Sequence, residues 1–302
     1  MKTNATVDVN GTPVAVSNLE KVMYPEAGFT KGDVIDYYVK ISPVLLPHLH
    51  ARPLTLKRYP DGVNGIYFYE RHCPSHRPKW VRTAAVSRAE GGKICYCVLD
   101  GLPALVWAAN LADLELHTFL HQAPAVRRPR SVVFDLDPGP PADILLCCEV
   151  GLALKRLLSR LGLKCFPKTS GSKGMQVYIP LNSHATYERT KAFAHAVAEM
   201  LERKHPDQVV SKMQKSLRPG KVLVDWSQND DHKTTVSVYS LRAKEQPTVS
   251  TPIKWSEVTS ALKHRDAPSL TFTSAEVLKR VEKMGDLFKP VLTLRQTLPA
   301  LV

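Results

Sequence analysis

Two aspartates lie one residue apart at the end of an apolar run, and together they could bind a divalent cation. The run is SVVFDLDP at residues 131–138, so the two acids are Asp135 and Asp137. In a β-strand, residues two apart point to the same face, and adjacent carboxylates repel unless a cation or a shared proton lies between them. Mg²⁺ and Mn²⁺ prefer such oxygen ligands and keep positions open for phosphate oxygens. The alternative is an acidic strand end that simply enters the turn at Pro138 and Gly139.

A third aspartate and a polar loop extend this pattern. Asp225 ends a second apolar run, VLVD at residues 222–225. The loop TSGSKG at residues 169–174 could cradle a phosphate with its amides, although it lacks the Walker A spacing and many surface loops have this composition. Three carboxylates, this loop and many basic residues predict two-metal phosphoryl chemistry, which polymerases and some nucleases share. No histidine or glutamate is obviously placed to activate water, which favours a transferase.

The elements that must position these residues follow from the spacing of apolar side chains and from turn signals. We expect a hairpin around Asn10-Gly11 and strands at 54–59, 66–69, 93–98, 131–138, 165–168, 177–181, 222–226 and 233–242. We expect helices beginning after Thr30 and at 102–120, 142–161, 187–204, 255–262 and 274–284. The strands at 222–226 and 233–242 should form a hairpin with Asp225 on one arm and Arg242 at the far end of the other.

Two N-terminal features could contact nucleic acid. Lys31 falls in the first turn after Thr30, where a lysine beside free backbone N–H groups makes an anion site, unless it is simply solvated. Lys57 lies on a strand next to one that carries Phe68 and Tyr69, which suits base stacking or a core aromatic cluster. Because neighbours on a strand face opposite sides, we expect one of these two aromatic residues in the core and the other exposed.

Composition sets limits on the class of protein. The 302 residues are 44% hydrophobic and 23% charged, as in ordinary folded soluble domains, and no run of about 18 apolar residues predicts a membrane span. The net charge of +13 indicates a polyanionic partner, nucleic acid before membrane. The first residues, MKTNAT, lack an apolar signal core, so we expect cytoplasmic residence. The six cysteines include no Cys-x-x-Cys pair, so reduced and mostly buried thiols are expected rather than zinc ligands.

In combination, these motifs resemble the polymerase domain of bacterial ATP-dependent DNA ligase D, a member of the archaeo-eukaryotic primase superfamily. The resemblance runs from NLEK at residues 18–21 to LFKP at 287–290, and also includes VDW at 224–226 with QN at 228–229, and YSLRA at 239–243. It implies an α+β primase-polymerase fold, with an RNA-recognition-like catalytic sheet packed with an N-terminal α/β lobe. Residues 1–302 would then form a single monomeric polymerase/primase-like domain of two closely packed lobes.

The resemblance also assigns roles to residues. The catalytic divalent ions would be held by Asp135, Asp137 and Asp225. The incoming nucleotide and template would be handled by Lys57, Phe68, Tyr69, His117, Ser170, Ser172, Lys173, Gln228 and Arg242. DNA would be bound by Asn18, Lys21 and Lys31 at a downstream 5′-phosphate, and by Arg218 and Lys221 on a mobile basic loop near the primer terminus. One position departs from the family pattern, because Gln176 stands where a histidine is usual and cannot be cationic.

The implied activity is template-directed addition of NTPs, and of dNTPs, to DNA primer ends during non-homologous end joining, with two Mn²⁺ or Mg²⁺ ions. The implied partners are DNA with 5′-phosphorylated ends or gaps, Ku and a DNA ligase, in the cytoplasm at the nucleoid. One alternative is a primase or primase-polymerase that starts chains without a primer and shares every motif. A second is a catalytically weak module that binds 5′-phosphorylated ends, which Gln176 would favour. A metal-dependent nuclease is the third.

Overall fold

The computed structural model describes residues 4–87 and 91–300, and the chain divides into two compact units. Residues 1–3, the first half of the MKTNAT segment used to predict cytoplasmic residence, lie outside the described part. Unit 1 comprises Met1–Pro124, Thr234–Val249 and Thr273–Gly285. Unit 2 comprises Ala125–Lys233, Ser250–Phe272 and Asp286–Val302. Unit 1 therefore contains two later segments besides the N-terminal one.

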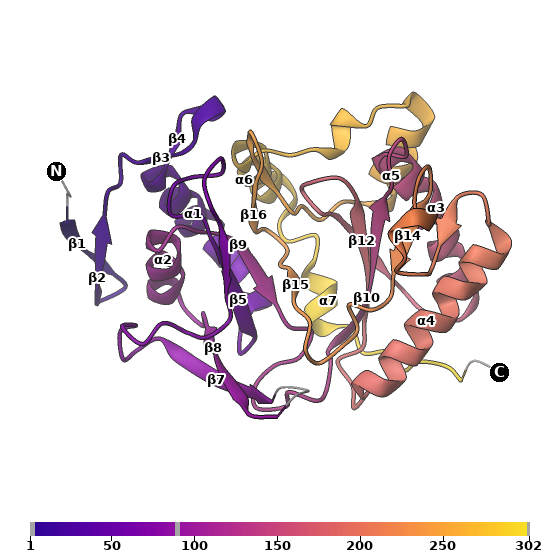
Figure 1. Ribbon diagram of the computed structural model, residues 1–302, viewed down its shortest axis with the longest axis horizontal. Coiled ribbons are helices and arrows are strands. Elements are labelled where there is room, and N and C mark those ends of the chain that lie inside the picture. Colours follow the sequence, from indigo (N-terminus) through magenta and orange to yellow (C-terminus); the bar gives the residue numbers. More distant parts are fainter. Residues whose placement is uncertain (1–3, 88–90, 301–302) are drawn as a thin grey trace. The chain divides into compact units, whose positions relative to one another are not determined.

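Unit 1 is built on a six-stranded sheet (Figure 1). Its strand order is β15-β9-β5-β8-β7, and the sixth strand, β6, pairs with β5. Its strands are β5 (Pro53–Arg58), β6 (Phe68–Glu70), β7 (Arg82–Ser87), β8 (Lys93–Val98), β9 (Asp113–Thr118) and β15 (Thr235–Val236). Smaller strands are β1 (Asn4–Val9), β2 (Thr12–Ser17), β3 (Val22–Tyr24), β4 (Phe29–Thr30), β16 (Leu241–Ala243) and β17 (Pro247–Val249). The hairpin predicted around Asn10-Gly11 is confirmed as β1 and β2.

The helices of unit 1 are α1 (Lys31–Leu49), α2 (Leu102–Asn110) and α6 (Ser274–Met284), with a short 3₁₀ turn at Pro25–Ala27. Helix α1 begins where predicted, because the Thr30 side chain accepts from the Asp33 amide while the Asp33 side chain accepts from the Thr30 amide. This reciprocal capping box satisfies amides that a helix end otherwise leaves without partners. Tyr37 and Tyr38 on α1 are buried, and their hydroxyls donate to Tyr239 O and Leu114 O at 2.8 Å each.

The helix predicted at 102–120 is wrong in its second half. Helix α2 ends at Asn110, Ala112 has a positive φ of 60°, and β9 follows in the centre of the sheet. The signal for a strand was present, since Leu114 and Leu116 alternate with polar residues in a period of two. This correction matters because it moves His117 from a helix end to a strand whose side chains face those of β5.

Unit 2 contains a five-stranded sheet in the order β11-β12-β10-β14-β13 (Figure 1). Its strands are β10 (Ser131–Pro138), β11 (Phe166–Thr169), β12 (Met175–Pro180), β13 (Val209–Val210) and β14 (Val222–Asp225). Its helices are α3 (Ile144–Arg160), α4 (Tyr187–Lys204), α5 (Trp255–His264) and α7 (Lys289–Thr293), with 3₁₀ turns at Lys215–Leu217 and Pro268–Leu270. Strand–helix–strand–strand–helix–strand succession with β10 and β12 adjacent confirms the predicted RNA-recognition-like sheet.

The two faces of β10 differ in their surroundings, because α3 packs on only one of them. Leu136 is fully buried, its carbonyl lies 3.5 Å from the Cys147 thiol of α3, and its side chain lies next to Gly151 of the same helix. Residues on either side of Leu136 point to the opposite face, because side chains alternate along a strand. Asp135 and Asp137 therefore project from the face that α3 does not cover.

The hairpin predicted between 222–226 and 233–242 does not form. Strand β14 pairs with β10 and β13, whereas Thr235–Val236 pairs with β9 in the sheet of unit 1. Arg242 lies on β16, which pairs with β17, and Tyr239 before it has a positive φ of 64°. A local turn signal predicted a local pairing, but long-range pairing with β9 prevails.

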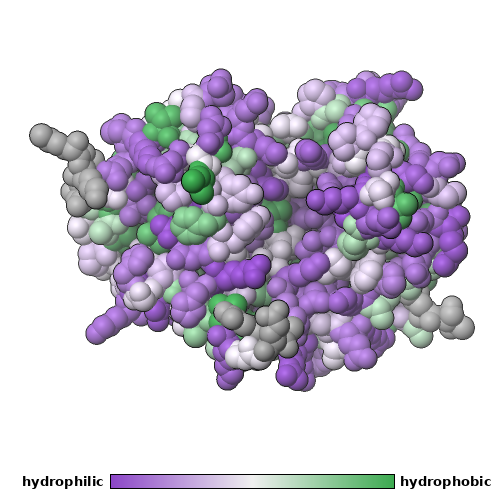
Figure 2. Space-filling view, viewed as in Figure 1, coloured by the Kyte–Doolittle hydropathy of each residue, from purple (hydrophilic) through white to green (hydrophobic). Residues whose placement is uncertain are grey.

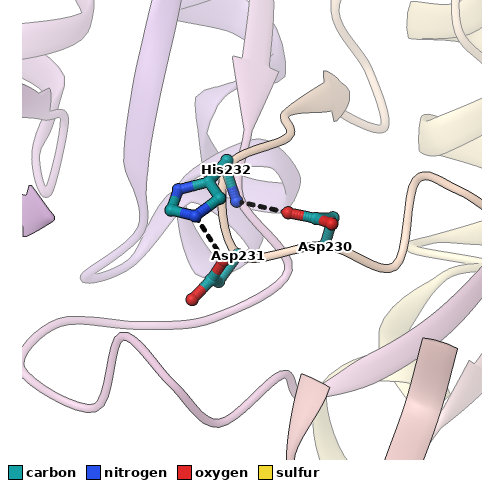
Figure 3. A group of neighbouring side chains, drawn as sticks. All are labelled: Asp230, Asp231 and His232. Carbon is teal, nitrogen blue, oxygen red and sulfur yellow. Dashed lines mark hydrogen bonds and ion pairs between the residues drawn. The ribbon is translucent and has the colours of Figure 1, made fainter. Parts of the chain in front are cut away.

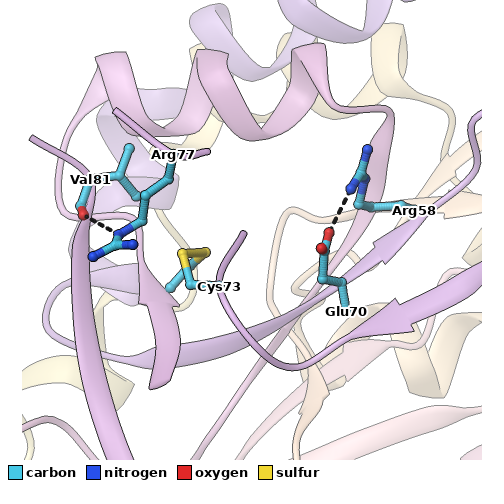
Figure 4. The surroundings of a disulfide bond; sticks show 6 residues. Arg58, Glu70, Cys73, Arg77 and Val81 are labelled. Atoms are coloured by element: carbon cyan, nitrogen blue, oxygen red, sulfur yellow. Dashed lines mark hydrogen bonds and ion pairs between the residues drawn. A yellow bond between two sulfur atoms is a disulfide. The ribbon is translucent and has the colours of Figure 1, made fainter. Parts of the chain in front are cut away.

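Two cysteines form a disulfide, so the prediction of reduced thiols is wrong for this pair (Figure 4). The Cys73 amide donates to Cys95 O at 2.7 Å, which brings the segment after β6 against β8 and places the Cα atoms of Cys73 and Cys97 4.9 Å apart. Arg58 and Glu70 form an ion pair of 2.6 Å on the neighbouring β5–β6 pair. The thiols of Cys147, Cys148 and Cys165 are buried and that of Cys95 is exposed.

On each unit, hydrophilic side chains cover most of the surface that Figure 2 shows. The exposed large hydrophobic residues include a consecutive run, Ile66 to Tyr69, each at least 41% exposed. Among the described residues, no helix is both long and apolar enough to cross a membrane.

Candidate active site

The aspartates of β10 and β14 face each other across the sheet of unit 2. Asp135 and Asp225 are direct partners in the antiparallel register, and Asp137 lies beside Leu223 two pairs further along. Directly opposed side chains in such a pair have Cβ atoms about 5 Å apart. The register therefore sets Asp135 against Asp225 at these two strand ends, with Asp137 two residues along the same face of β10.

The Asp225 carboxylate is held in place by the turn that follows it. One oxygen accepts from the Ser227 amide at 2.8 Å and from the Ser227 hydroxyl at 2.6 Å, and the other accepts from the Gln228 side-chain amide at 2.8 Å. A carboxylate offers about four lone-pair sites, so these three hydrogen bonds leave about one site for a cation, on the oxygen that contacts Gln228. Gln228, predicted to bind the nucleotide, is thus placed directly beside a predicted metal ligand.

Asp135 also belongs to a row of polar side chains across the sheet. It is paired with Gln176 of β12, and Gln176 is paired with Lys168 of β11. Lys168 is completely buried, donates to the Ser250 hydroxyl at 2.6 Å and lies 5.7 Å from the Tyr178 ring centre. The sequence prediction missed Lys168, whose only signal was a charge inside an apolar strand. Gln176 itself is buried and hydrogen-bonded to Asp135. Because glutamine is uncharged, the positive charge of this row comes from Lys168 on β11, one strand further from Asp135 than a protonated histidine at position 176 would be.

The electrostatics of this row fit a divalent cation. Burial and the neighbouring Asp225 charge raise the pKa of Asp135 to about 6, although the Gln176 hydrogen bond and the Lys168 charge act in the opposite direction. The part of this pKa shift that comes from Asp225 reflects repulsion between the two carboxylates, which a bound cation would remove. The donors are all carboxylate oxygens, which are the ligands that Mg²⁺ and Mn²⁺ prefer.

Asp137 is more exposed and has a basic neighbour. Its carboxylate lies 3.8 Å from the Arg218 guanidinium, and its side chain is 53% exposed. The loop that carries Arg218 is attached to the end of β10, because the Gly139 amide donates to Lys221 O at 2.8 Å and the Gly220 amide donates to Gly139 O at 3.0 Å. Of the two predicted primer-binding residues, Arg218 therefore lies next to Asp137, whereas the Lys221 ammonium donates to Pro206 O at 2.6 Å.

The predicted phosphate loop joins β11 to β12 and closes on itself. The Ser170 amide donates to Gly174 O at 2.9 Å, and the Ser170 hydroxyl accepts from the amides of Ser172 and Gly174 at 3.2 Å each. Gly174 packs directly on β10, where a Cβ would lie 2.0 Å from Leu136 O. Ser172 and Lys173 are exposed at the tip of the loop, so an anion can reach them.

A different acidic group brings its ligand atoms within 4.8 Å of one another: Asp230, Asp231 and His232 (Figure 3). Asp230 is already paired with Lys191 at 2.6 Å, and His232 contacts Asp231 at 3.1 Å. Burial tends to raise the pKa of Asp230, but the Lys191 and His232 hydrogen bonds outweigh it and lower that pKa. Its charges are therefore balanced by neighbouring side chains, and we assign this turn no catalytic role.

In unit 1, three of the predicted nucleotide-binding side chains gather around one carboxylate, that of Glu115. The Glu115 Oε2 atom lies 2.9 Å from His117 Nε2, 3.3 Å from Arg242 Nε and 3.4 Å from Lys57 Nζ. The register explains this, since Lys57 is paired with Glu115 across β5 and β9, and His117 follows two residues later on the same face. The sequence prediction named the three partners and missed Glu115 because it placed residues 115–118 at a helix end.

The aromatic residues of β6 differ from the prediction that one of them is buried. Phe68 and Tyr69 are 41% and 52% exposed, because β6 is a three-residue edge strand that pairs with β5. They do face opposite sides: Phe68 stacks on Arg58, and Tyr69 contacts the His117 ring with centroids 5.9 Å apart. Tyr67, which the sequence prediction missed, lies 4.6 Å from the Lys57 ammonium.

The predicted 5′-phosphate residues also come together in unit 1. The Lys31 amide donates to Lys21 O at 2.8 Å, and the turn from Asn18 to Lys21 is closed by a further backbone bond of 3.1 Å. The prediction of free amides here is wrong, because the Lys31 and Gly32 amides donate to Lys21 O and Leu19 O. An anion would therefore be held by the two ammonium groups, of which that of Lys21 also pairs with Asp61 at 2.7 Å.

The predicted site residues thus form three separate groups, one in unit 2 and two in unit 1. Unit 2 gathers the aspartates with Gln228 and Arg218, and places the phosphate loop beside β10. Unit 1 gathers Lys57, Tyr69, His117 and Arg242, and separately Asn18, Lys21 and Lys31.

Comparison with known proteins adds independent evidence. The family model described as "LigD, primase-polymerase domain" matches residues 30–288. The chain is 39% identical over 285 residues to "Multifunctional non-homologous end joining protein LigD" of Mycolicibacterium smegmatis. This alignment covers 92% of this chain and 36% of that protein. The chain is 34% identical over 270 residues to "Bifunctional non-homologous end joining protein LigD" of Bacillus subtilis, which covers 89% of this chain and 42% of that protein. The chain therefore spans well under half the length of these relatives.

A solved structure shows the same fold. "Polymerase Domain from Mycobacterium tuberculosis Ligase D in complex with DNA" matches with a TM-score of 0.86 and 38% sequence identity, over 92% of this chain and 98% of that one. This likeness confirms the predicted α+β primase-polymerase fold. A match over most of the sequence, from the family model and from relatives in several bacteria, leads to one conclusion: the chain belongs to the LigD primase-polymerase domain family.

Proposed function

We propose that this chain is a template-directed nucleotidyltransferase that adds NTPs or dNTPs to DNA primer ends, filling gaps and extending ends in non-homologous end joining. The observation that carries the proposal is the register of β10 and β14, which sets Asp135 opposite Asp225 with Asp137 alongside. Membership of a primase-polymerase family and the fold shared with a polymerase domain support it.

In the proposed reaction, the primer 3′-hydroxyl attacks the α-phosphorus of the nucleotide, and pyrophosphate leaves. Asp135, Asp137 and Asp225 would hold two divalent cations, Mn²⁺ or Mg²⁺, which lower the pKa of the attacking hydroxyl and offset charge on the phosphates. Gln228 fixes the orientation of the Asp225 carboxylate, which it contacts at 2.8 Å. Arg218 lies 3.8 Å from Asp137, where its charge is available to a phosphate close to that carboxylate.

The remaining roles are assigned to three surfaces. Ser170, Ser172 and Lys173 bind nucleotide phosphates from the loop after β11, and Lys221 binds the DNA backbone. Lys57, His117 and Arg242 bind the nucleotide, while Phe68 and Tyr69 stack on bases, as their exposure allows. Asn18, Lys21 and Lys31 bind a downstream 5′-phosphate. Ku and a DNA ligase are the proposed partners, acting with a monomer in the cytoplasm at the nucleoid.

Primer extension tests the proposal. The substrate is a gapped duplex with a 5′-phosphate at the far side of the gap, incubated with NTPs or dNTPs and with Mn²⁺ or Mg²⁺. Wild-type protein should add the nucleotide complementary to the template, and should add far less when the primer is omitted. Addition without a primer at a similar rate would favour the primase alternative. Stable binding of the gapped duplex without any addition would favour the end-binding alternative.

The pH dependence of 5′-phosphate binding provides a second prediction. Burial, helped by the nearby Lys21 charge, lowers the pKa of Lys31 to about 8. As the pH rises through this value, Lys31 loses its proton and its positive charge, while a phosphate monoester stays dianionic above about pH 7. The affinity advantage of 5′-phosphorylated over 5′-hydroxyl gapped DNA should therefore fall several-fold between pH 7 and pH 9, measured by fluorescence anisotropy.

The matched control for this prediction is Lys31→Arg. Arginine stays charged throughout this range, so the advantage of the 5′-phosphate should become nearly independent of pH. An equal decline in the variant and the wild type would show that another group causes it.

A further inference from the structure

Glu115 accepts from donors on several elements of unit 1 at once. Its Oε1 atom accepts from the Ala243 amide at 3.0 Å and from the Tyr59 hydroxyl at 3.4 Å. Its Oε2 atom contacts His117, Arg242 and Lys57, as described above. The Glu115 side chain is 2% exposed, whereas those of Lys57, His117 and Arg242 are 12%, 14% and 15% exposed. The carboxylate therefore lies underneath, and the three nitrogen-bearing side chains lie between it and solvent.

A second buried acid on the same strand shows that burial alone does not create this arrangement. Asp113 lies two residues before Glu115 on β9, is paired with Arg58 beyond a β-bulge, and is fully buried. Burial raises the pKa of Asp113 well above its usual range. Burial pushes the pKa of Glu115 in the same direction, but the His117 hydrogen bond and the positive charges of Arg242 and Lys57 outweigh it and leave that pKa well below its usual range. Glu115 is therefore ionised, and its negative charge interacts with Lys57, His117 and Arg242.

This contact also selects the tautomer of His117. Burial lowers the pKa of His117, and its hydrogen bond to Glu115 only partly offsets that effect, so the imidazole is neutral at pH 7. A carboxylate only accepts hydrogen bonds, so the Nε2 atom that faces Glu115 must carry the proton. The Nδ1 atom is then an acceptor. The outer surface of the cluster consequently combines two cations with one acceptor, in fixed positions.

The carboxylate supplies the directional contact that Lys57, His117 and Arg242 share. Lys57 is also surrounded by the rings of Tyr59, Tyr67 and Tyr69 at 4.6 to 5.4 Å, but cation–π contacts tolerate a range of positions. Arg242 and Lys57 would repel each other in a partly buried setting. We propose that Glu115 is the positioning residue that holds Lys57, His117 and Arg242 in the arrangement that binds the nucleotide. This inference rests on the proposed function, in which these three residues contact the nucleotide.

The experiment compares Glu115→Gln with Asp113→Asn, which makes the same chemical change two residues away on the same strand. ATP binding is titrated in the presence of Mg²⁺ on a gapped duplex whose primer lacks the 3′-hydroxyl, so that no chemistry occurs. Glu115→Gln should weaken ATP binding on the order of tenfold or more, because orientation of several charge-assisted contacts is lost. Asp113→Asn should stay within about threefold of wild type, and both variants should bind the duplex itself as the wild type does.

Two further measurements separate positioning from charge balance. Glu115→Asp keeps the charge but shortens the side chain, so it should also weaken ATP binding. Nitrogen chemical shifts of His117 should report one tautomer in the wild type and a mixture in Glu115→Gln, since an amide can donate as well as accept. Circular dichroism melting confirms that each variant is folded, and if Glu115→Gln does not fold, Glu115→Asp alone decides the matter.

Several outcomes would overturn the inference. ATP binding by Glu115→Gln that equals or exceeds wild-type binding would mean that Glu115 only opposes the triphosphate charge. Wild-type binding by Glu115→Asp would mean that charge matters and position does not. In both cases the proposed function stands, since the wild type binds ATP. Failure of the wild type to bind ATP on this duplex would overturn the proposed function and the inference together.

Discussion

Asp137→Ala is expected to lower the rate of primer extension on the order of a thousandfold, with little change in the stability of the fold. A missing cation ligand removes electrostatic stabilisation of the phosphates worth several kcal/mol, which corresponds to that factor. The cost in stability is small because the Asp137 side chain is 53% exposed and its basic neighbour, Arg218, is 3.8 Å away. Exposed pairs of this kind contribute about 0–1 kcal/mol. Single-turnover extension and thermal melting measure the two effects.

The control for this experiment is Asp231→Ala. Asp231 is also a partly exposed acid in unit 2, and it contacts His232 at 3.1 Å. It is not one of the three aspartates proposed to bind the cations. Its replacement should leave extension within about threefold of wild type, since loss of a surface pair costs little. Normal extension by Asp137→Ala, at the metal concentrations that the wild type needs, would refute the assignment of the metal ligands.

Gly174→Ala is expected to destabilise the protein by about 3 kcal/mol, because overpacking against rigid backbone is among the costlier single substitutions. The added Cβ would lie 2.0 Å from Leu136 O and 3.1 Å from Pro138 Cδ. Both neighbours belong to β10, and Leu136 separates the two aspartates of that strand. Either β10 or the loop at 169–174 must therefore move. Extension should fall well beyond the folded fraction lost, as measured by urea unfolding and by extension at a temperature where the variant is folded.

Gly101→Ala provides the comparison. A Cβ at Gly101 would meet Pro103 Cδ at 3.7 Å, which is an ordinary contact, so its effect should stay below about 1 kcal/mol. Equal stability and activity of the two variants would mean that Gly174 does not hold the loop against β10.

Local signals in the sequence were sufficient for much of unit 2. Structure within a few residues is determined by the apolar run before Asp135, by the capping of α4 by Thr186, and by the proline and glycine residues after β10. The two aspartate-bearing strands could be predicted for the same reason. Their direct pairing was not predictable from either strand alone, because register depends on which faces are buried when the sheet forms.

Predictions failed where distant segments decide the outcome. Residues 113–118 alternate as a strand does, but the apolar stretch before them continues a helix pattern, and their pairing with β5 decides between the two. Residues 235–236 join the same sheet from more than a hundred residues away, which no local turn signal reveals. Glu115 was missed as a consequence, since its role depends on β5 and β16 approaching β9. The disulfide was missed because it depends on the contact between the Cys73 amide and β8.

The alternation of the chain between the two units has a consequence for synthesis on the ribosome. The sheet of unit 1 is completed by β15 at Thr235–Val236, and α6 at Ser274–Met284 packs with α1. Unit 1 therefore cannot reach its final form until α6 has been made, long after its strand β1. Domains that fold one after another during translation begin with the N-terminal one. Here all five strands of the unit 2 sheet lie in one segment, Ala125–Lys233, so the middle of the chain is the first part able to complete a whole sheet together with α3 and α4.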